Sequence, residues 1–555
     1  MHPASDHAPL RLVALGGLGE FGLNALVLEW DEHCLLLDAG ALFGTAELPG
    51  VDSVVPDFRY LAERRERLRG IVLTHGHEDH IGGLAFALQA APAPVFGSAL
   101  TLGFVRRRLR DRGLEADLRL LTPPQDVEVG PFRVFPIRVA HSVIDSLALA
   151  VETPAGVVLA SGDFKIGSGG AADETTDVDA LSRWGDRGVD VLLSDSTNVE
   201  TRGRTGAEDD LLPAFEEVFA RTRGRVLVSC FATSVPRIQR VARTALAAGR
   251  SLAFIGRRMA DNAEVATELG LLDVPPGRVL PASAVRDYPA GGLCLFVSGS
   301  QGEPFSALSM MSVDEHRDLA VGPGDTVVLS SRPIPGNERA VSRLIGNLFR
   351  RGCDVVHGGT ARVHVSGHAS QDELAEMIQR VRPRHFVPVH GEYRMLAQHA
   401  RLAVQAGVPA DRVFILEDGD VLALAGGAAT RAPSVAAGRI LLDRSGVDEV
   451  EEVVVRDRRH LSSEGIVVPV LVLDRQTGRI ESPPELVTRG FVDWEEWPGL
   501  MDDATRLVAE VVEERPPEEH YDPALTRERV RQELRRLFRK RTQRRPMVIP
   551  VVMEV

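Results

Sequence analysis

The most concentrated set of metal-binding side chains in this 555-residue chain lies in the segment LTHGHEDHIGG, residues 73–83. Six consecutive positions there hold His75, His77, Asp79 and His80. Imidazole nitrogens and carboxylate oxygens suit Zn²⁺, and Mn²⁺ accepts a similar set. Four ligands at this spacing do not easily converge on one ion, but the first pair and the last pair can each serve an ion of their own. The segment therefore predicts half of a two-metal site.

A two-metal site needs further ligands, among them a bridging carboxylate. Three residues qualify because each follows a strand-like run: His141, Asp163 and His390. The segment 75–80 also follows such a run, GIVLT. Open α/β sheets carry their sites at the C-terminal ends of strands, so we expect these segments to meet. The alternative is a set of hydrogen-bonded surface histidines that bind no metal.

The elements that position these residues follow an α/β pattern. Short runs rich in Val and Leu alternate with helical stretches over the first 210 residues. Residues 212–352 repeat the alternation, and the segment 385–392 then returns to the earlier style, which is typical of a domain insertion. The predicted parts are a first domain over 1–211, its insertion over 212–352, its return over 353–445, a charged linker over 446–463 and a C-terminal domain over 464–555.

The composition is that of an ordinary globular protein, with 44% hydrophobic and 26% charged residues. The net charge of −14 argues weakly against non-specific nucleic-acid binding. Arginine clusters at 64–69, 106–112 and 527–545 are either solvated helix faces or local basic grooves. The four cysteines form no CxxC pair and indicate a reducing compartment. We find no signal peptide and no membrane-spanning run, so we expect a cytoplasmic protein without a membrane partner.

The segment THGHEDHIGG is similar to the signature of the metallo-β-lactamase superfamily. With its insertion, the whole chain resembles the β-CASP branch of that superfamily and, within it, the bacterial ribonuclease J family. The resemblance also rests on GGLGEFGLN, SDSTN, SGSQGEP, SSRPIPGNE, HVSGHAS and VHGEYRML. It implies an α/β fold, a metallo-β-lactamase αββα sandwich with an inserted α/β β-CASP domain and a small α+β C-terminal domain.

The resemblance also implies how the ligands are shared. One Zn²⁺ would bind His75, His77 and His141, and a second would bind Asp79, His80 and His390, with Asp163 as the bridge. The three β-CASP motifs fall on Asp195, His368 and His390. Histidine at the third motif is typical of members that act on RNA, whereas the DNA-processing branch usually has valine.

A chemical role follows for the motif residues. Two Zn²⁺ ions lower the pKa of a shared water and neutralise a phosphodiester. Attack would expel the 3′-oxygen of the upstream nucleotide, and His368, oriented by Asp195, is the candidate donor of its proton. Asp79 could help to deprotonate the water, although its role as a ligand explains it equally well.

The segment HVSGH has a second candidate role. It comprises His364, Val365, Ser366, Gly367 and His368. By composition alone it is equally well an ordinary strand-end turn. The family resemblance implies that it holds the 5′-terminal phosphate of the substrate, with Gly367 allowing close approach and Ser366 and His364 as donors.

The resulting hypothesis is a zinc-dependent ribonuclease with 5′–3′ exonuclease activity, preferring 5′-monophosphate RNA, and endonuclease activity in mRNA decay and rRNA maturation. It would bind single-stranded RNA, form a homodimer or homotetramer through its C-terminal domain and join an RNA-degradation complex. Two alternatives stay open. A DNA-processing β-CASP nuclease is opposed by His390, and a small-molecule metallo-hydrolase by the large insertion.

Overall fold

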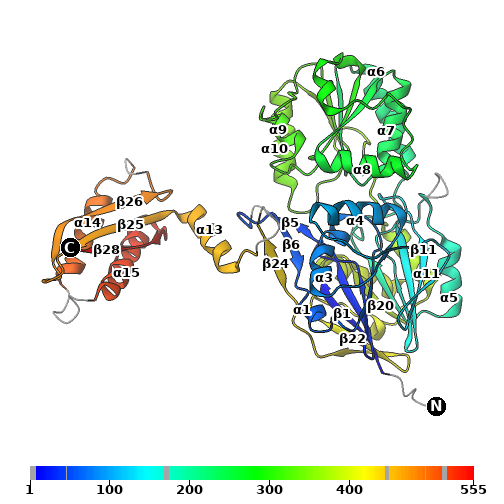
Figure 1. Ribbon diagram of the computed structural model, residues 1–555, viewed down its shortest axis with the longest axis horizontal. Helices are drawn as coiled ribbons and strands as arrows, with labels where there is room; N and C mark the ends of the chain where they lie inside the picture. The colour runs from blue at the N-terminus through cyan, green and yellow to red at the C-terminus, as the bar shows by residue number, and fades with distance from the viewer. Residues whose placement is uncertain (1–7, 45–46, 168–173, 444–448, 494–495, 515–521) are drawn as a thin grey trace. The chain divides into compact units, whose positions relative to one another are not determined.

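The computed structural model describes residues 8–44, 47–167, 174–443, 449–493, 496–514 and 522–555. The chain forms two compact units (Figure 1). The larger comprises Met1–Leu42 and Val54–Ile440, and the smaller comprises Phe43–Ser53 and Leu441–Val555.

Two stacked β-sheets form the centre of the larger unit. The first has the order β23 (Ala428–Ala432), β22 (Val421–Ala425), β1 (Leu10–Gly16), β3 (Ala25–Trp30), β4 (His33–Leu37), β7 (Leu68–Val72), β8 (Val95–Gly97) and β9 (Leu118–Leu120). The second has the order β10 (Val127–Val129), β11 (Phe132–Arg138), β12 (Leu147–Thr153), β13 (Gly156–Ala160), β14 (Val191–Asp195) and β20 (His385–Val389). Leucine and valine side chains from both sheets form one buried cluster between them.

Helices cover the outer face of each sheet. The first sheet packs on α3 (Leu84–Ala90) and α4 (Ala99–Asp111), and the second on α5 (Val178–Arg187), α11 (Gln371–Val381) and α12 (Tyr393–Gln405). Two shorter helices are α1 (Arg59–Ala62) and α2 (Glu78–Ile81). The predicted αββα sandwich is therefore confirmed.

The inserted segment builds a sheet of its own, drawn in green in Figure 1. Its five parallel strands have the order β16 (Ser251–Ile255), β17 (Leu293–Val297), β15 (Val226–Ser229), β18 (Thr326–Leu329) and β19 (Asp354–His357). Its helices are α6 (Leu212–Arg221), α7 (Val235–Ala247), α8 (Arg257–Glu268), α9 (Ala307–Ser312) and α10 (Glu338–Arg350). The predicted parallel α/β insertion is present, and its last strand, β19, lies just beyond residue 352.

The register of the second sheet decides what can meet at its edge. Strands β13, β14 and β20 are parallel neighbours, so their C-terminal ends lie side by side. Asp163, Asp195 and His390 stand at or just after those ends. Beyond β20, strand β21 (Gly391–Glu392) pairs with β2 (Leu18–Gly19) from the glycine-rich turn near the N-terminus.

The smaller unit has an antiparallel hairpin, β25 (Ile466–Leu473) and β26 (Ile480–Arg489), with β27 (Met547–Val548) and β28 (Val551–Glu554) parallel to β25. Its helices are α13 (Glu452–Glu464), α14 (Leu500–Glu513) and α15 (Pro523–Thr542). Three further short strands are β5 (Leu42–Phe43), β6 (Ser53–Pro56) and β24 (Arg439–Leu442). Residues 446–448 of the predicted linker lie outside the described residues, and α13 occupies most of its remainder.

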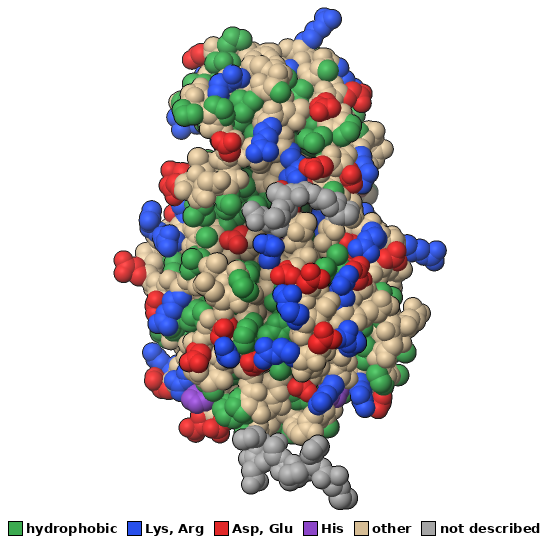
Figure 2. All heavy atoms as spheres, turned by 90° about the vertical axis from the view of Figure 1, so that its right-hand side faces the viewer, with side chains coloured by type: hydrophobic (Ala, Val, Ile, Leu, Met, Phe, Trp, Pro, Cys, Tyr) green, Lys and Arg blue, Asp and Glu red, His purple; other side chains and the backbone are tan. Residues whose placement is uncertain are grey.

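The surface carries charges of both signs. On the face that Figure 2 shows, acidic and basic side chains are interspersed, and neither gathers into one large patch. All four cysteines are buried and free. Within the described ranges, no helix has the length and apolar character needed to cross a membrane.

Candidate metal centre

The histidine-rich segment is held by backbone contacts as it leaves β7. His77 is the N-terminal cap residue of α2, which carries Asp79 and His80 in its single turn. The backbone carbonyl of Asp79 accepts hydrogen bonds from the Asn24 backbone N–H at 3.1 Å and from its side-chain amide at 3.0 Å. A Cβ on Gly40 would lie 1.8 Å from that carbonyl oxygen, so only glycine allows this approach.

Four donors converge at the first candidate ion position. His75 Nε2 and His141 Nε2 each lie 3.1 Å from His77 Nδ1. Asp163 Oδ2 lies 3.4 Å from His75 Nε2 and 3.7 Å from His141 Nε2. Three imidazole nitrogens and one carboxylate oxygen at such mutual distances fit a tetrahedral Zn²⁺ ion.

A second group of donors shares the same aspartate. Asp163 Oδ2 lies 3.4 Å from His80 Nε2, and Asp163 Oδ1 lies 3.3 Å from His390 Nδ1. Asp79 Oδ2 lies 3.2 Å from His390 Nε2 and 3.8 Å from His80 Nε2. Because Asp163 belongs to both groups and is buried, it has the position of a bridging carboxylate.

A third donor group overlaps the second. It consists of Asp163, Asp195, His368 and His390, with ligand atoms within 4.8 Å of one another. The structure thus brings together every metal ligand and catalytic residue that the sequence predicts. His368 lies close enough to Asp163 and His390 to be either a metal ligand or a proton donor.

The histidines are oriented by a buried aspartate that sequence reasoning missed. His80 Nδ1 lies 2.8 Å from Asp38 Oδ2. Thr74 Oγ1 donates to the same oxygen at 2.9 Å and lies 3.0 Å from His75 Nδ1. Carboxylates and hydroxyls at Nδ1 fix the tautomer, so that Nε2 of His75 and of His80 would be the metal-binding nitrogen. The Asn24 side-chain amide lies 3.1 Å from His80 Nε2. The signal available in the sequence was that Asp38 directly follows a strand, and Asp163 also lies just beyond a strand end.

Burial and charge give His75, His141 and Asp163 the protonation states that metal binding requires, whereas His80 and His390 would each have to lose a proton to bind an ion. Burial lowers the pKa of His75 and of His141 well below the usual value, so both imidazoles are neutral donors. Burial opposes the charge of His80 and His390 too, but Asp163 and neighbouring carboxylates outweigh it, raising the pKa of His390 to about 10. Although burial raises the pKa of Asp163, the histidines hold it below its usual range, so this carboxylate is ionised.

His368 and Asp195 form a close pair beside the metal ligands. His368 Nδ1 lies 2.8 Å from Asp195 Oδ2 and 4.0 Å from Asp163 Oδ2. Asp195 Oδ1 accepts hydrogen bonds from the backbone N–H and the hydroxyl of Thr197 at 2.9 and 2.8 Å. Asp195 is buried, whereas the His368 side chain is 20% exposed. Burial opposes protonation of His368, but Asp195 outweighs it and raises its pKa.

The HVSGH segment is anchored from both sides. The Ser366 carbonyl accepts a hydrogen bond from Lys165 Nζ at 3.3 Å, and the Ser366 hydroxyl accepts one from the His368 backbone N–H at 3.1 Å. The Gly367 carbonyl lies 2.8 Å from His141 Nδ1. A Cβ on Gly367 would lie 2.8 Å from the His141 ring, so the observed close approach is to a metal-ligand candidate.

Sequence reasoning also missed the buried arginine behind this segment. Arg237 Nη2 donates to the Val365 carbonyl at 3.0 Å, and Arg237 Nη1 donates to the Ser330 carbonyl at 2.7 Å. Glu208 neutralises Arg237 through contacts of 2.7 and 3.0 Å. No local pattern singled out Arg237, because an arginine in an amphipathic helix is ordinarily exposed.

The fold and the site define a class of protein, and comparison with known families agrees with it. The chain matches the metallo-beta-lactamase superfamily over residues 18–189 and the ribonuclease J beta-CASP domain over 223–348. It matches the Zn-dependent metallo-hydrolase RNA specificity domain over 355–415 and the ribonuclease J C-terminal domain over 453–555. It is thus a β-CASP protein of the metallo-β-lactamase fold.

Relatives that match most of the chain identify the family within this class. The chain is 36% identical to ribonuclease J2 of Bacillus subtilis, over 98% of this chain and 99% of the relative. It is 40% identical to ribonuclease J of Synechocystis, over 87% of this chain and 76% of the relative. A crystal structure of a protein of unknown function from Enterococcus faecalis, 15% identical, shares the fold with a TM-score of 0.55 over 75% of this chain and all of that one. The chain belongs to the ribonuclease J family of metal-dependent β-CASP nucleases.

Proposed function

We propose that this chain hydrolyses single-stranded RNA as a 5′–3′ exonuclease and as an endonuclease, with two Zn²⁺ ions or, in their place, Mn²⁺. The observation that supports the proposal is that Asp163 belongs to both donor groups. The first ion would bind His75, His77 and His141, the second Asp79, His80 and His390, and Asp163 both. The cellular roles would be mRNA decay and rRNA maturation.

The chemistry divides between the ions and the chain. When bound, the ions supply a nucleophilic water at neutral pH and neutralise the phosphodiester. The phosphorus–oxygen bond to the 3′-oxygen of the upstream nucleotide breaks as the new one forms, which leaves a 5′-phosphate on the downstream product. His368 would deliver the proton that the 3′-oxygen needs, because Asp195 occupies its Nδ1 and leaves Nε2 for the substrate.

The 5′-end preference would come from residues 364–368. The Ser366 hydroxyl can still donate its own hydrogen, because it serves as acceptor towards the His368 N–H. His364 accepts a hydrogen bond from Arg237 at Nδ1, so its N–H is at Nε2, and this N–H would be the donor to a terminal phosphate. A phosphate held on this segment would place the first phosphodiester near the metal ligands, since Gly367 contacts His141.

Self-association through residues 464–555 would complete the functional particle as a homodimer or homotetramer. An open sheet edge supports this proposal. Among the described strands, β28 pairs only with β25, so its other edge is available to a second chain. Val551, Met553 and Val555 on and beside that strand are exposed apolar side chains. Deleting residues 460–555 should lower the number of chains per particle, measured by light scattering, and an unchanged number would refute this assignment. An RNA-degradation complex would be a further partner.

One comparison tests the activity itself. RNA and DNA oligonucleotides of the same sequence would carry a 5′-monophosphate, 5′-triphosphate or 5′-hydroxyl end, with and without a chelator. Chelator-sensitive release of mononucleotides, fastest from 5′-monophosphate RNA, is the expected result. Internal cuts that ignore the 5′ end would remove the phosphate role of residues 364–368. A preference for DNA would contradict the RNA assignment, and no cleavage would favour a small-molecule hydrolase.

A further inference from the structure

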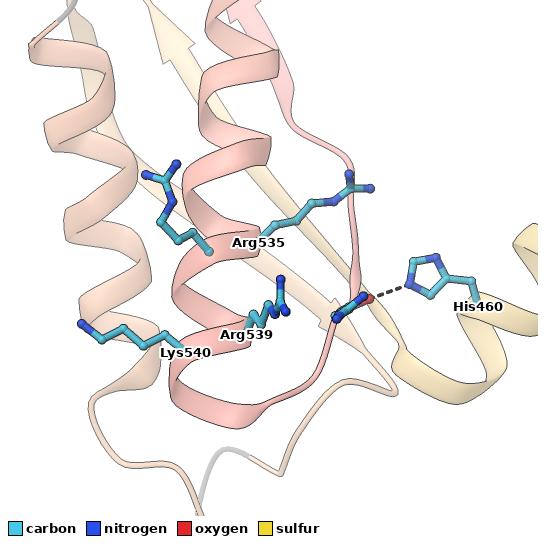
Figure 3. A pocket seen from close by; sticks show the side chains of 6 residues that line it. His460, Arg535, Arg539 and Lys540 are labelled. Carbon is cyan, nitrogen blue, oxygen red and sulfur yellow. Dashed lines mark hydrogen bonds between the residues drawn. The ribbon is translucent and has the colours of Figure 1, made fainter.

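A basic pocket lies in the smaller unit, on helix α15, and the proposed chemistry does not use it. The cavity, of about 840 Å³, is lined by six residues, which we call the α15 basic pocket: His460, Arg535, Arg536, Arg539, Lys540 and Arg545. Figure 3 shows Arg535, Arg539 and Lys540 projecting from the last turns of α15, with His460 on the neighbouring helix α13. All five cations are exposed.

The packing of α15 decides which of its side chains reach the pocket. Val530, Leu534 and Phe538 point into the core of the smaller unit at helical spacing. Arg535 and Arg539 are four positions apart, so they lie on one face of the helix. His460 lies on α13, and its Nε2 is 2.5 Å from the backbone carbonyl of Arg545, so this contact links α13 to the pocket.

The charge of the α15 basic pocket is largely uncompensated. In the part of the chain that the structure describes, no acidic residue lines it, and of its cationic side chains only that of Arg536 is paired, with Glu533 at 2.7 and 2.8 Å. Glu464 Oε2 accepts a hydrogen bond from the backbone N–H of Arg545 at 2.7 Å. Among the described residues, no hydrogen bond or ion pair engages the side-chain cations of Arg535, Arg539 or Lys540. Several uncompensated cations close together repel one another, although the helix C-terminus offsets part of that cost. In a chain with a net charge of −14, such a local excess points to an anionic ligand.

We propose that the α15 basic pocket binds the phosphate backbone of RNA at a second contact, separate in the chain from the metal centre. The occupant is RNA because the lining offers five cations and His460 but no Phe, Tyr, Trp or aliphatic residue, whereas protein interfaces usually have an apolar centre. No Phe, Tyr or Trp offers a platform for base stacking, and the His460 ring is held against the Arg545 carbonyl, so the contact would read phosphates and not sequence. The choice of ligand, but not the existence of an anion site, rests on the proposed ribonuclease function.

The chain offers a matched pair of variants for the test. Arg535→Gln with Arg539→Gln removes two unpaired cations from the pocket. Arg527→Gln with Arg531→Gln removes two cations at the same spacing from the N-terminal half of α15, outside the pocket lining. Both of these have partners already, since Arg527 Nε donates to the Pro523 carbonyl and Arg531 pairs with Glu528. The two double variants of the full chain therefore lose equal charge.

Binding of a fluorescein-labelled single-stranded RNA would be measured in chelator, over a range of salt concentrations. For a long RNA, the pocket variant should bind about tenfold more weakly, and the slope of log K against log salt should fall by about 1.4, or 0.7 for each lost phosphate contact. The control variant should bind as the wild type does. With metal restored, cleavage of a short 5′-monophosphate RNA should be unchanged in both variants.

Other outcomes would overturn the inference. Equal weakening in both variants would mean that only overall charge matters. Unchanged RNA affinity with a lower melting temperature would mean that these arginines stabilise the C-terminal end of α15 and do not bind RNA. Unchanged RNA affinity with an altered oligomer mass would mean that they contact another protein chain. If the wild type binds RNA through these arginines but never cleaves it, the proposed function fails and the pocket assignment stands.

Discussion

The guanidinium of Arg237, in the inserted domain, donates a hydrogen bond to His364 Nδ1 at 2.8 Å. Arg237 is only 1% exposed and also bonds to Glu208, Ser330 and Val365. One buried side chain thus links helix α7 and the residue that follows strand β18, both in the insertion, to the HVSGH segment beside the metal ligands. The position of this segment therefore depends on how the insertion packs.

Removing the guanidinium of Arg237 should lower the stability of the folded protein. Arg237→Met leaves the Glu208 carboxylate buried and unpaired, and breaking a buried pair in this way costs about 3–5 kcal/mol. Thermal unfolding of the full chain would show the loss as a lower melting temperature. Arg237→Met combined with Glu208→Leu should recover most of it, because neither charge then remains. A double variant as unstable as the single one would show that Glu208 is not the source of the cost.

The same contact should make stability depend on pH. Burial, and then Arg237, lower the pKa of His364 from 6.5 to about 3. As the pH falls below 6.5, the unfolded chain takes up a proton at this residue and the folded protein does not, so stability decreases. His364→Gln should lose less stability than the wild type between about pH 7 and pH 5. Parallel melting curves for the two proteins across that range would contradict the assignment.

Asp163 should be needed for both ions. Asp163→Asn keeps the size of the side chain but removes the charge that faces both donor groups. Zinc bound per chain, measured by mass spectrometry of the purified protein, should fall by at least about half, and RNA cleavage should be lost. Undiminished cleavage would refute the two-metal assignment.

His368 should be needed for the reaction and not for the metal. His368→Ala should keep the bound zinc and slow cleavage by about 10² to 10⁴, the usual contribution of a general acid. Asp195→Asn should act through the same imidazole, so the double variant should be little worse than His368→Ala. If His368→Ala loses zinc, the third donor group would instead be a metal site and His368 a ligand.

Gly367 should affect zinc binding, because it packs against the ring of His141, a candidate metal ligand. An alanine Cβ there would lie 2.8 Å from the His141 ring, a contact that backbone or ring must shift to relieve. Gly367→Ala should therefore weaken zinc binding as well as cleavage, whereas Ser366→Ala should affect only the preference for 5′-monophosphate ends. Zinc titration with a fluorescent competitor, run beside cleavage of RNAs with different 5′ ends, separates the two effects. Normal zinc affinity in Gly367→Ala would show that the contact is readily relieved.

The sequence by itself determined the parts that depend on local chemistry and spacing. The histidine-rich segment 73–83, the strand ends that carry Asp163 and His390, the α/β insertion and the basic helix near the C-terminus were all predicted from patterns of a few residues. Such patterns are sufficient because a strand end, a helix face or a ligand pair is defined by neighbours in the chain. Family resemblance added the division of the ligands between two ions.

Tertiary structure decided which distant residues share an atom-scale contact. Asp38 against His80, Gly367 against His141 and Arg237 against Glu208 join residues that are 29 to 226 positions apart in the chain. Each contact results from the packing of whole sheets and helices, and no local pattern encodes it. The arginines of α15 show the same division, since the helix could be predicted from sequence, but their shared pocket with His460 required the folded unit.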